Sequence, residues 1–505
     1  MPFLDYLPEL FTWWNMTMLI GGTVGGLLLG AAPGLSPTMS VALLIPFTFA
    51  MDPAAGLILL GAVYTATVAG GAVSAILVNI PGAPANIATL FDGNAMARQG
   101  RATEALHYCF IASGIGGIFG VLLLMFFTPM LAEFALRFGP SELFWMAVLG
   151  ITVIGSLGAK STLRGLFAGA FGVWLSTIGY DPVLGVPRFV LFPDMAGGIN
   201  IIAALIGLFA IPEVLALLSR ARARDQITTY EMSQHSVWTS LRGCVKRIRA
   251  LTIGTIVGSF VGLIPGAGGQ IAGLVAYDQT RRFSPYRDRF GQGEPAGVIA
   301  AESANNAMVG PSLVPLLTLS IPGSPTAAVL LGGLLIHGLF PGPDLFTKHA
   351  EVTWVFIDSL LLAQVVMVIA GLYLSRFSYY ITRIPAEYMA AGVMVLAVFG
   401  TYSVQNSFPD VLWMMGLGVA MYFFDKAGFS AAPLVLGIIL GPIAETNFVQ
   451  GQMVSMSSGG TLPYFFTGTL NLIMIGLCVV SVAYSLFGEI KPKNQPQQEV
   501  MNESQ

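Results

Sequence analysis

The sequence has 505 residues, of which 55% are hydrophobic and only 10% are charged, and its formal net charge is −3. Soluble domains carry about 25% charged residues, so this balance excludes an ordinary water-soluble fold. The chain also lacks the basic block of a nucleic-acid-binding protein. Uncharged stretches at 10–51, 53–91, 303–343 and 446–488 each exceed the roughly 18 apolar residues that indicate a membrane span. We therefore predict an all-α integral membrane protein whose solvent is the lipid bilayer.

The first apolar stretch contains a proline-glycine break. Asp5 and Glu9 are the only charges among the first 51 residues. The segment thus lacks the basic region of a secretory signal, and we expect it to be retained. Within it, GLLLGAAPG at 26–34 ends in Pro33 and Gly34. Proline removes an amide donor and glycine permits backbone angles closed to other residues, so this pair predicts a broken transmembrane helix.

The same breaks recur in the second half of the chain. GLLLGAAPG at 26–34 matches GSFVGLIPG at 258–266, and VNIPGAP at 78–84 matches LSIPGSP at 319–325. The two matches have offsets of 232 and 241 residues. The nine extra residues are accounted for by a polar insertion, RRFSPYRDRFGQGE, between the two motifs of the second copy. The chain is therefore predicted to contain an internal structural repeat.

The positions of lysine and arginine orient the two copies, because short cytoplasmic loops carry an excess of both. Basic residues flank the segment 251–280 on both sides, which predicts a re-entrant hairpin that enters from the cytoplasm, with its tip at 264–270. Only acidic residues flank the corresponding first hairpin, so we expect it to enter from outside and the repeat to be inverted. The flanking basic residues are Arg220, Arg222, Arg224, Lys246, Arg247 and Arg249 before the segment, and Arg281, Arg282, Arg287 and Arg289 after it.

The predicted architecture has about eleven crossings and two re-entrant hairpins, with the N-terminus outside and the C-terminus inside. Residues 1–219 form the first transmembrane repeat and 251–490 the second. A basic cytoplasmic linker at 220–250 separates them, and 491–505 form a polar cytoplasmic tail.

Four Pro-Gly breaks in inverted pairs predict a cavity. Unwound chain at membrane depth lies inside protein or beside water, because each freed backbone group costs several kcal/mol in hydrocarbon. Amides at half-helix N-termini suit carboxylates, and freed carbonyls suit a cation such as sodium. Alternatively, the breaks are simple kinks whose polar residues satisfy the freed groups. These polar residues are Ser36, Thr38, Asn79 and Asn86 in the first copy, and Gln270, Ser320, Ser324 and Thr326 in the second.

A second polar group lies in AESANNA at 300–306, just before an uncharged run. On a helix, Glu302 shares a face with Asn305 or Asn306. An ionisable group inside a membrane predicts a functional site, here for a coupling ion or proton. The alternative is that Glu302 lies at the interface and pairs with a loop arginine. Asp92 adjoins a loop and is expected at the interface.

Cysteine and histidine predict no metal centre. The three cysteines are scattered without ligand spacing, and the four histidines lack a carboxylate at helical spacing. We expect no cofactor, no catalytic residues and no metal beyond a transported sodium ion.

Five long stretches carry a family resemblance: GLLLGAAPGLSP, VNIPGAPANIATLFDG, GLIPGAGGQIAGLVAYDQTRRFS, FGQGEPAGVIAAESANNA and LTLSIPGSPTAAVLLGGLLIHGLFPGP. In this order and separation they resemble the TctA-like large membrane subunit of the tripartite tricarboxylate transporter family. The resemblance extends from about residue 18 to about residue 485.

The resemblance implies a secondary active importer of tricarboxylates or dicarboxylates in the bacterial inner membrane. Its partners would be a small membrane subunit and an extracytoplasmic solute-binding protein, and an ion gradient, usually of sodium, would drive uptake. The chain has no Gly-rich phosphate loop with lysine, as expected without ATP. Ser320 stands where the family often has glycine. The resemblance implies substrate contacts at Pro33, Gly34, Asn79, Pro81, Gly82, Pro84, Pro265, Gly266, Gly268, Gly269, Pro322, Gly323 and Pro325.

Other functions remain open from the residues alone. A passive organic-anion channel would use similar backbone dipoles without coupling. A carboxylate symporter independent of a binding protein would need the same site. An intramembrane enzyme would need converging acid, base or metal groups. A cation-proton antiporter would need buried carboxylates in the broken segments, which are uncharged.

Overall fold

The computed structural model describes residues 5–157, 161–181, 185–221, 235–266, 268–381, 384–456 and 460–490. Nearly all their regular structure is helical, and the strands β1 (Gly179–Tyr180) and β2 (Pro187–Arg188) form one small antiparallel sheet. Eight of the described helices are long and apolar enough to cross a membrane, which confirms the all-α membrane fold. They are α3 (Trp13–Ala31), α5 (Pro53–Val78), α7 (Ala102–Ala135), α10 (Ile201–Ala221), α18 (Ala350–Leu374), α20 (Ala386–Gln405), α22 (Ala431–Ser455) and α24 (Thr469–Ile490).

The remaining helices are shorter or less apolar, and several of them end at the breaks. A broken crossing is not spanned by any single helix, so the count of about eleven crossings stays a prediction. These remaining helices are α2 (Leu7–Leu10), α4 (Pro37–Thr48), η1 (Pro84–Asn86), α6 (Ile87–Arg98), α8 (Pro140–Leu157), α9 (Thr162–Ser176), η2 (Pro193–Met195), α11 (Val237–Lys246), α12 (Ile248–Leu263), α13 (Gly268–Phe283), η3 (Arg287–Arg289), α14 (Pro295–Ala307), α15 (Val309–Leu319), α16 (Pro325–Ile336), α17 (Asp344–Thr347), α19 (Ser378–Ile381), α21 (Phe408–Lys426) and α23 (Thr461–Phe466).

The two halves have the same order of helices around their breaks. Helices α3, α4 and α5, followed by a break and then η1 with α6, correspond to α12, α13 and α14 with α15, followed by a break and then α16. Asn79 and Ser320 occupy equivalent positions and both have left-handed backbone angles, with φ of 58° and 59°. Few residues other than glycine adopt this conformation. Asn79 ends α5 and Ser320 ends α15, so both helices break where the sequence predicted.

Backbone hydrogen bonds at the two breaks also correspond. The amide of Gly82 donates to the carbonyl of Gly71 at 3.2 Å, and the amide of Gly323 donates to that of Ser312 at 3.1 Å. A Cβ atom at Gly82 would lie 2.7 Å from the Cα of Gly71, and one at Gly323 would lie 2.7 Å from the Cα of Ser312. Each break is therefore pressed against the preceding helix, where only glycine fits.

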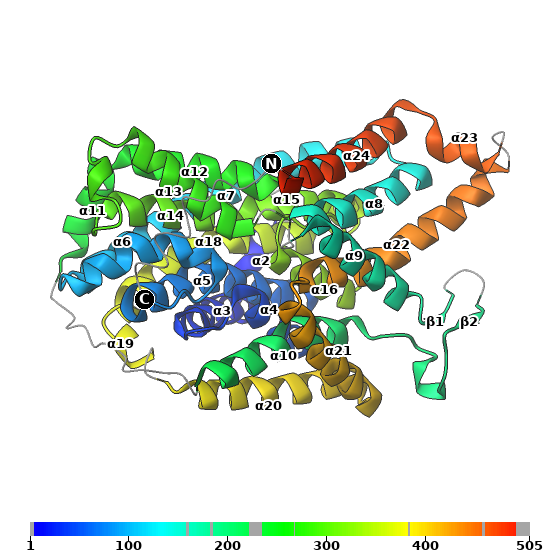
Figure 1. Ribbon diagram of the computed structural model, residues 1–505, viewed down its shortest axis with the longest axis horizontal. Coiled ribbons are helices and arrows are strands. Elements are labelled where there is room, and N and C mark those ends of the chain that lie inside the picture. Colours follow the sequence, from blue (N-terminus) through cyan, green and yellow to red (C-terminus); the bar gives the residue numbers. More distant parts are fainter. Residues whose placement is uncertain are drawn as a thin grey trace.

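Helices of the two halves interlock. The first-half helices α8 and α9 pack on α22, while α10 packs on α20 and α21. Helices α7 and α14 also pack together, and Figure 1 shows α7, α12, α13 and α14 side by side at one end of the molecule. The largest buried apolar cluster draws on both halves, with Val63 and Leu205 from the first and Leu330 and Leu434 from the second. The halves therefore share one core.

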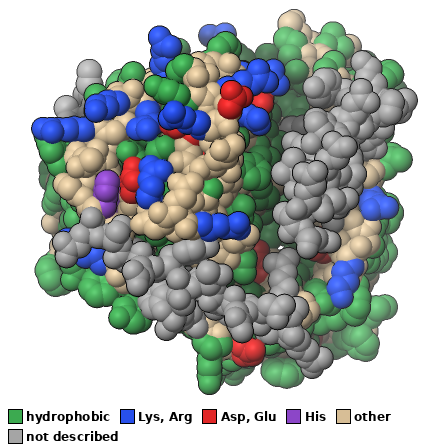
Figure 2. Space-filling view, turned by 60° about the vertical axis from the view of Figure 1, so that its left-hand side comes forward, with side chains coloured by type: hydrophobic (Ala, Val, Ile, Leu, Met, Phe, Trp, Pro, Cys, Tyr) green, Lys and Arg blue, Asp and Glu red, His purple; other side chains and the backbone are tan. Residues whose placement is uncertain are grey.

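Basic side chains gather at the end of the molecule that carries α6 and α11. Figure 2 brings this end forward and shows many of the visible Lys and Arg side chains there. Two ion pairs lie in this region, Arg101 with Glu104 at 2.8 Å and Arg247 with Glu294 at 3.1 Å. The middle of the predicted linker, at 222–234, and the predicted tail at 491–505 lie outside the described residues.

Candidate functional site

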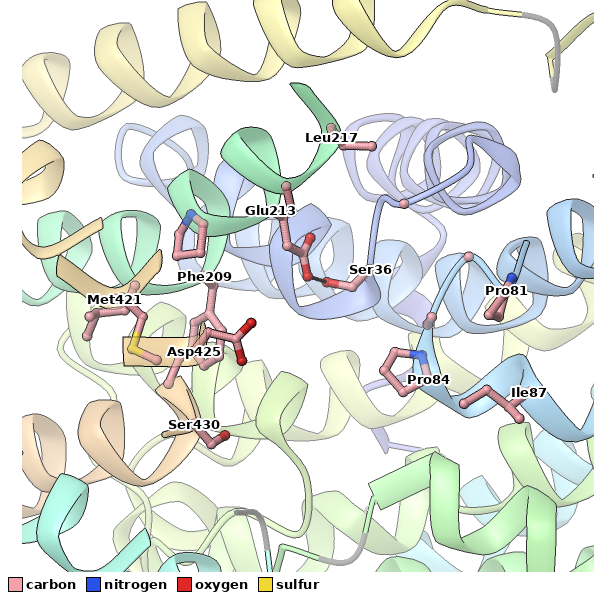
Figure 3. Close-up of a pocket in the computed structure, with 17 residues that line it drawn as sticks. Ser36, Pro81, Pro84, Ile87, Phe209, Glu213, Leu217, Met421, Asp425 and Ser430 are labelled. Carbon is pink, nitrogen blue, oxygen red and sulfur yellow. Dashed lines mark hydrogen bonds between the residues drawn. The ribbon is translucent and has the colours of Figure 1, made fainter. Parts of the chain in front are cut away.

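A cavity of about 460 Å³ lies against the two breaks of the first half (Figure 3). Its walls come from the chain before α4, the segment leading into η1 and α6, and helices α10, α21 and α22. The lining residues are Gly34, Ser36, Pro81, Gly82, Ala83, Pro84, Ile87, Leu208, Phe209, Pro212, Glu213, Ala216, Leu217, Met421, Asp425, Ser430 and Ala431.

The polar centre of the cavity is a contact between Ser36 and Glu213. Ser36 is the N-cap of α4, and its hydroxyl accepts a hydrogen bond from the Met39 amide at 3.2 Å. The same hydroxyl donates to Oε1 of Glu213 at 2.6 Å. The start of a helix carries partial positive charge, so a carboxylate is stabilised there. The protein thus already places one carboxylate at the start of α4.

Helices α10 and α21 bring the two acidic residues to the cavity. Gly207 on α10 faces the backbone of Met414, and Gly418 on α21 faces Ile211, so the two helices run parallel in close contact. Figure 3 shows the carboxylates of Glu213 on α10 and Asp425 on α21 pointing into the cavity. Among the described residues that line it, none is Lys, Arg or His.

Five of the predicted substrate residues line this cavity: Gly34, Ser36, Pro81, Gly82 and Pro84. The other predicted residues do not line it, including all those of the second half. Sequence reasoning missed Glu213, Asp425 and Ser430. Glu213 carried a detectable signal, because it follows Pro212 inside an apolar run, and an ionisable residue in a membrane span indicates a site.

The breaks of the second half contact the first half elsewhere. The hydroxyls of Thr38 and Thr326 lie 2.9 Å apart and join the first turns of α4 and α16. Ser324 is the N-cap of α16, where it accepts from the Ala327 amide at 3.1 Å and also bonds the Tyr64 hydroxyl at 2.9 Å. These side chains satisfy helix ends and fix the two halves to each other.

The remaining second-half candidates are dispersed around their break. The Gly266 amide donates to the Gly323 carbonyl at 3.1 Å, which ties the two second-half breaks together. Ser320 donates to the Pro341 carbonyl at 3.3 Å, and Gln270 is exposed. Gly269 faces Ala85 of the first half. The other second-half candidates, at or beside these breaks, are Pro265, Gly268, Pro322 and Pro325. In the first half, Pro33 and Asn79 also lie at the breaks but do not line the cavity.

A second polar cluster surrounds Glu302, which is fully buried. Five neutral side chains donate hydrogen bonds to its carboxylate, and we call these six residues the Glu302 cluster. Oε1 accepts from Thr89, from Asn305 at 3.2 Å and from Asn86 at 3.4 Å. Oε2 accepts from Ser113 at 3.1 Å and from the thiol of Cys109 at 3.6 Å. The donors come from both halves, on η1, α6, α7 and α14.

The alternative in which Glu302 pairs with a loop arginine is wrong. Its side chain has no exposed surface, and its hydrogen-bond partners among the described residues are all neutral, so it does not pair with a loop arginine. Asn86 belongs to this cluster and does not line the cavity. Asn306 is also buried, but neither atom of its amide has a hydrogen-bond partner among the described residues. Through Asn86, the buried carboxylate of Glu302 contacts the broken segment of the first half.

Asp92 contacts a loop, and its side chain is fully buried in the protein. Oδ1 accepts from the amides of Gly291, Gly293 and Glu294 at 2.8–2.9 Å, and Oδ2 accepts from the Tyr277 hydroxyl at 2.8 Å. Asp92 on α6 therefore holds the loop that precedes α14, in the other half of the chain.

The described residues contain no group of three or more His, Cys, Asp or Glu side chains that could hold a metal ion. The three cysteines are buried and form no disulfide bonds with one another.

Comparison with known proteins identifies the family of this chain. The model of the tripartite tricarboxylate transporter TctA family matches residues 16–436. The chain belongs to the TctA family. It is 33% identical to an uncharacterized 52.8 kDa protein in the TAR-I ttuC' 3' region of Agrobacterium vitis, over 93% of each chain. It is 32% identical to an uncharacterized protein in the TAR-II ttuC' 3' region of the same organism, over 47% of this chain and 96% of the relative.

Membership of the TctA family makes this protein a multi-pass membrane component of tripartite tricarboxylate transport. The family is one of transporters, and it operates in a system that implies partner subunits and a binding protein. The resemblance carried by the broken segments is thereby confirmed.

Proposed function

We propose that this TctA-family protein is the substrate-translocating subunit of an ion-gradient-driven importer of di- or tricarboxylates. The observation that carries the proposal is the cavity at the first-half breaks, in a chain of this family. About 460 Å³ is within the range of small-ligand sites. The hydroxyl of Ser36 and the start of α4 are suited to bind a carboxylate group.

The acidic lining of the cavity favours coupled transport over a passive anion channel. Glu213 and Asp425 would repel a carboxylate substrate, since like charges disfavour each other at close range. Helix dipoles offset only part of this repulsion. We infer that cations bind together with the substrate, and sodium is the proposed coupling ion. A channel selective for anions would gain nothing from these carboxylates.

We further propose that the two halves form an inverted repeat with re-entrant hairpins. The interlocking of α10 with α20 and α21, and of α22 with α8 and α9, supports a two-fold relation between the halves. Helices α12 and α13 have 16 residues each and pack against one another. At 1.5 Å per residue each is about 24 Å long, shorter than the roughly 30 Å hydrocarbon core.

The proposed partners are a small membrane subunit and an extracytoplasmic solute-binding protein that delivers the carboxylate. The proposed location is the bacterial inner membrane, with the basic end of the molecule facing the cytoplasm. No nucleic acid is involved in this proposal.

Uptake into liposomes tests the proposal. The chain is reconstituted with its small membrane subunit, the binding protein is added, and radiolabelled citrate and succinate are followed with an inward gradient of sodium or of choline. We expect accumulation only with sodium. Replacing Ala216 by Trp fills the cavity, and we expect it to reduce uptake at least tenfold.

A matched control is Ala391→Trp, which adds the same side chain at an exposed position on α20. It should transport as the parent protein does. If the labelled carboxylate only reaches equal concentrations on both sides, and neither sodium nor the binding protein changes this, the result would favour the passive channel. Accumulation that needs sodium but no binding protein would favour the independent symporter.

A further inference from the structure

The Glu302 cluster contains a buried carboxyl group without a positive partner. Glu302 lies 0% exposed, and no ion pair among the described residues includes it. Neutral hydrogen bonds stabilise a carboxylate, but an isolated ionised group away from water remains costly. A single positive charge bound nearby would remove this cost.

Two amide oxygens of the cluster are available to a ligand. Oδ1 of Asn86 and Oδ1 of Asn305 are buried and have no hydrogen-bond partner among the described residues. Both are oxygens, which accept hydrogen bonds or bind cations. The NH₂ groups of these amides face Glu302, and rotation of both amides would bring the two oxygens to a metal cation beside Oε1.

Backbone carbonyls complete an oxygen-rich shell. The Asn86 amide nitrogen lies 3.2 Å from the carbonyl of Val68, and the Asn305 amide nitrogen lies 3.0 Å from the carbonyl of Ala85. If each amide turns over, its oxygen takes the position between that carbonyl and Oε1 of Glu302. The hydroxyl of Thr89 is already at this oxygen. Hard cations prefer such carboxylate, amide and carbonyl oxygens.

Glycines provide the room for the two amides. A Cβ atom at Gly71 would collide with Oδ1 of Asn86. A Cβ atom at Gly273 would lie 3.0 Å from Oδ1 of Asn305. The amides are therefore held on each side of the carboxylate by close approach of α5 and α13.

We propose that the Glu302 cluster binds one monovalent metal cation of about the size of sodium, through Glu302, Thr89 and the two asparagine amides. The single carboxylate matches a single positive charge. The ligands come from η1 and α6 of the first half and α14 of the second, so the cation holds the first-half break against the second half. This deepens the proposed function, because it places the coupling ion.

Binding of ²²Na⁺ to the purified full-length chain, without any carboxylate, tests the site. We expect saturable binding and a rise in the unfolding temperature in sodium chloride compared with choline chloride. Glu302→Gln should lower ²²Na⁺ affinity at least tenfold and abolish the sodium-dependent rise. Thr89→Val, which retains the Glu302 carboxylate, should lower the affinity for ²²Na⁺ severalfold. This variant replaces Glu302→Gln in the test if Glu302→Gln does not fold.

Glu351→Gln is the matched control, because it also removes one carboxylate but lies exposed in the first turn of α18, outside both the cavity and the Glu302 cluster. It should bind ²²Na⁺ as the parent chain does. The proposal is overturned if the parent chain binds no ²²Na⁺, if Glu302→Gln binds it normally, or if only pH and not sodium shifts the unfolding temperature. Normal ²²Na⁺ binding without carboxylate uptake would instead contradict only the proposed function.

Discussion

Ser36 and Glu213 determine which charge the cavity presents to a ligand. The Ser36 hydroxyl donates to the Glu213 carboxylate at the start of α4, which is where a substrate carboxylate would be stabilised. A resident carboxylate and a substrate carboxylate compete for the same position. Sequence reasoning identified Ser36 from its place in the break, but Glu213 is 177 residues away.

Glu213→Gln should therefore strengthen substrate binding. Glutamine retains the size of the side chain and can still bond Ser36, but it removes the negative charge. Two unit charges about 4 Å apart interact by about 1 kcal/mol in water and more near protein, so KM for carboxylate uptake should fall at least about fivefold. Initial uptake rates in liposomes measure this. The exposed Glu351→Gln on α18 serves as the control and should leave KM unchanged. An unchanged or higher KM for Glu213→Gln would contradict the competition.

At the scale of elements, the structure depends on contacts made where helices end. Left-handed residues end α5 and α15, and serine N-caps begin α4 and α16. Asp92 makes a further such contact, because it accepts three backbone amides of the loop before α14. This contact joins α6 of the first half to a loop that the first half does not contain.

Asp92→Ala should loosen this loop. The amides of Gly291, Gly293 and Glu294 lose their acceptor, and each unsatisfied buried donor costs about 1–3 kcal/mol. We expect faster hydrogen exchange at these amides, measured by mass spectrometry of the corresponding peptide. Tyr277→Phe removes only the hydroxyl donor and should leave their exchange nearly unchanged. Equal exchange in Asp92→Ala and the parent protein would show that the loop is held by other contacts.

At the scale of the whole molecule, the two halves are joined through a few polar contacts inside one apolar core. The hydroxyls of Thr38 and Thr326 lie 2.9 Å apart, and Tyr64 bonds Ser324 across the same boundary. Transporters with inverted repeats work by movement of one part against another around a central site. If this protein does so, contacts between the first turns of α4 and α16 must open during each cycle.

A disulfide between Thr38→Cys and Thr326→Cys should stop uptake. The two cysteines are introduced into a chain whose own three cysteines are replaced by alanine. We expect oxidation to form the cross-link, detected by mass spectrometry, with loss of carboxylate uptake and recovery after reduction. Each single cysteine variant, treated with the same oxidant, controls for oxidation elsewhere. Unimpaired uptake by fully cross-linked protein would mean that this contact stays closed during transport.

The sequence by itself determined the fold class, the position of the breaks and the family. These features are local or compositional: apolar runs choose the bilayer, and proline and glycine act on the backbone where they stand. Five of the predicted substrate residues do line the cavity, because they form the broken segments themselves. The division of the chain into repeats at 1–219 and 251–490 remains a prediction. The helices of the two halves share one core.

Only the tertiary structure decided which side chains meet. Glu302 and Thr89 are 213 residues apart, and Ser36 and Glu213 are 177 apart. It also decided that Asp92 and Glu302 are buried, although both lie beside loops or polar segments in the sequence. Side-chain partners across such separations depend on how α6, α10 and α14 pack, and no spacing within one segment records that packing.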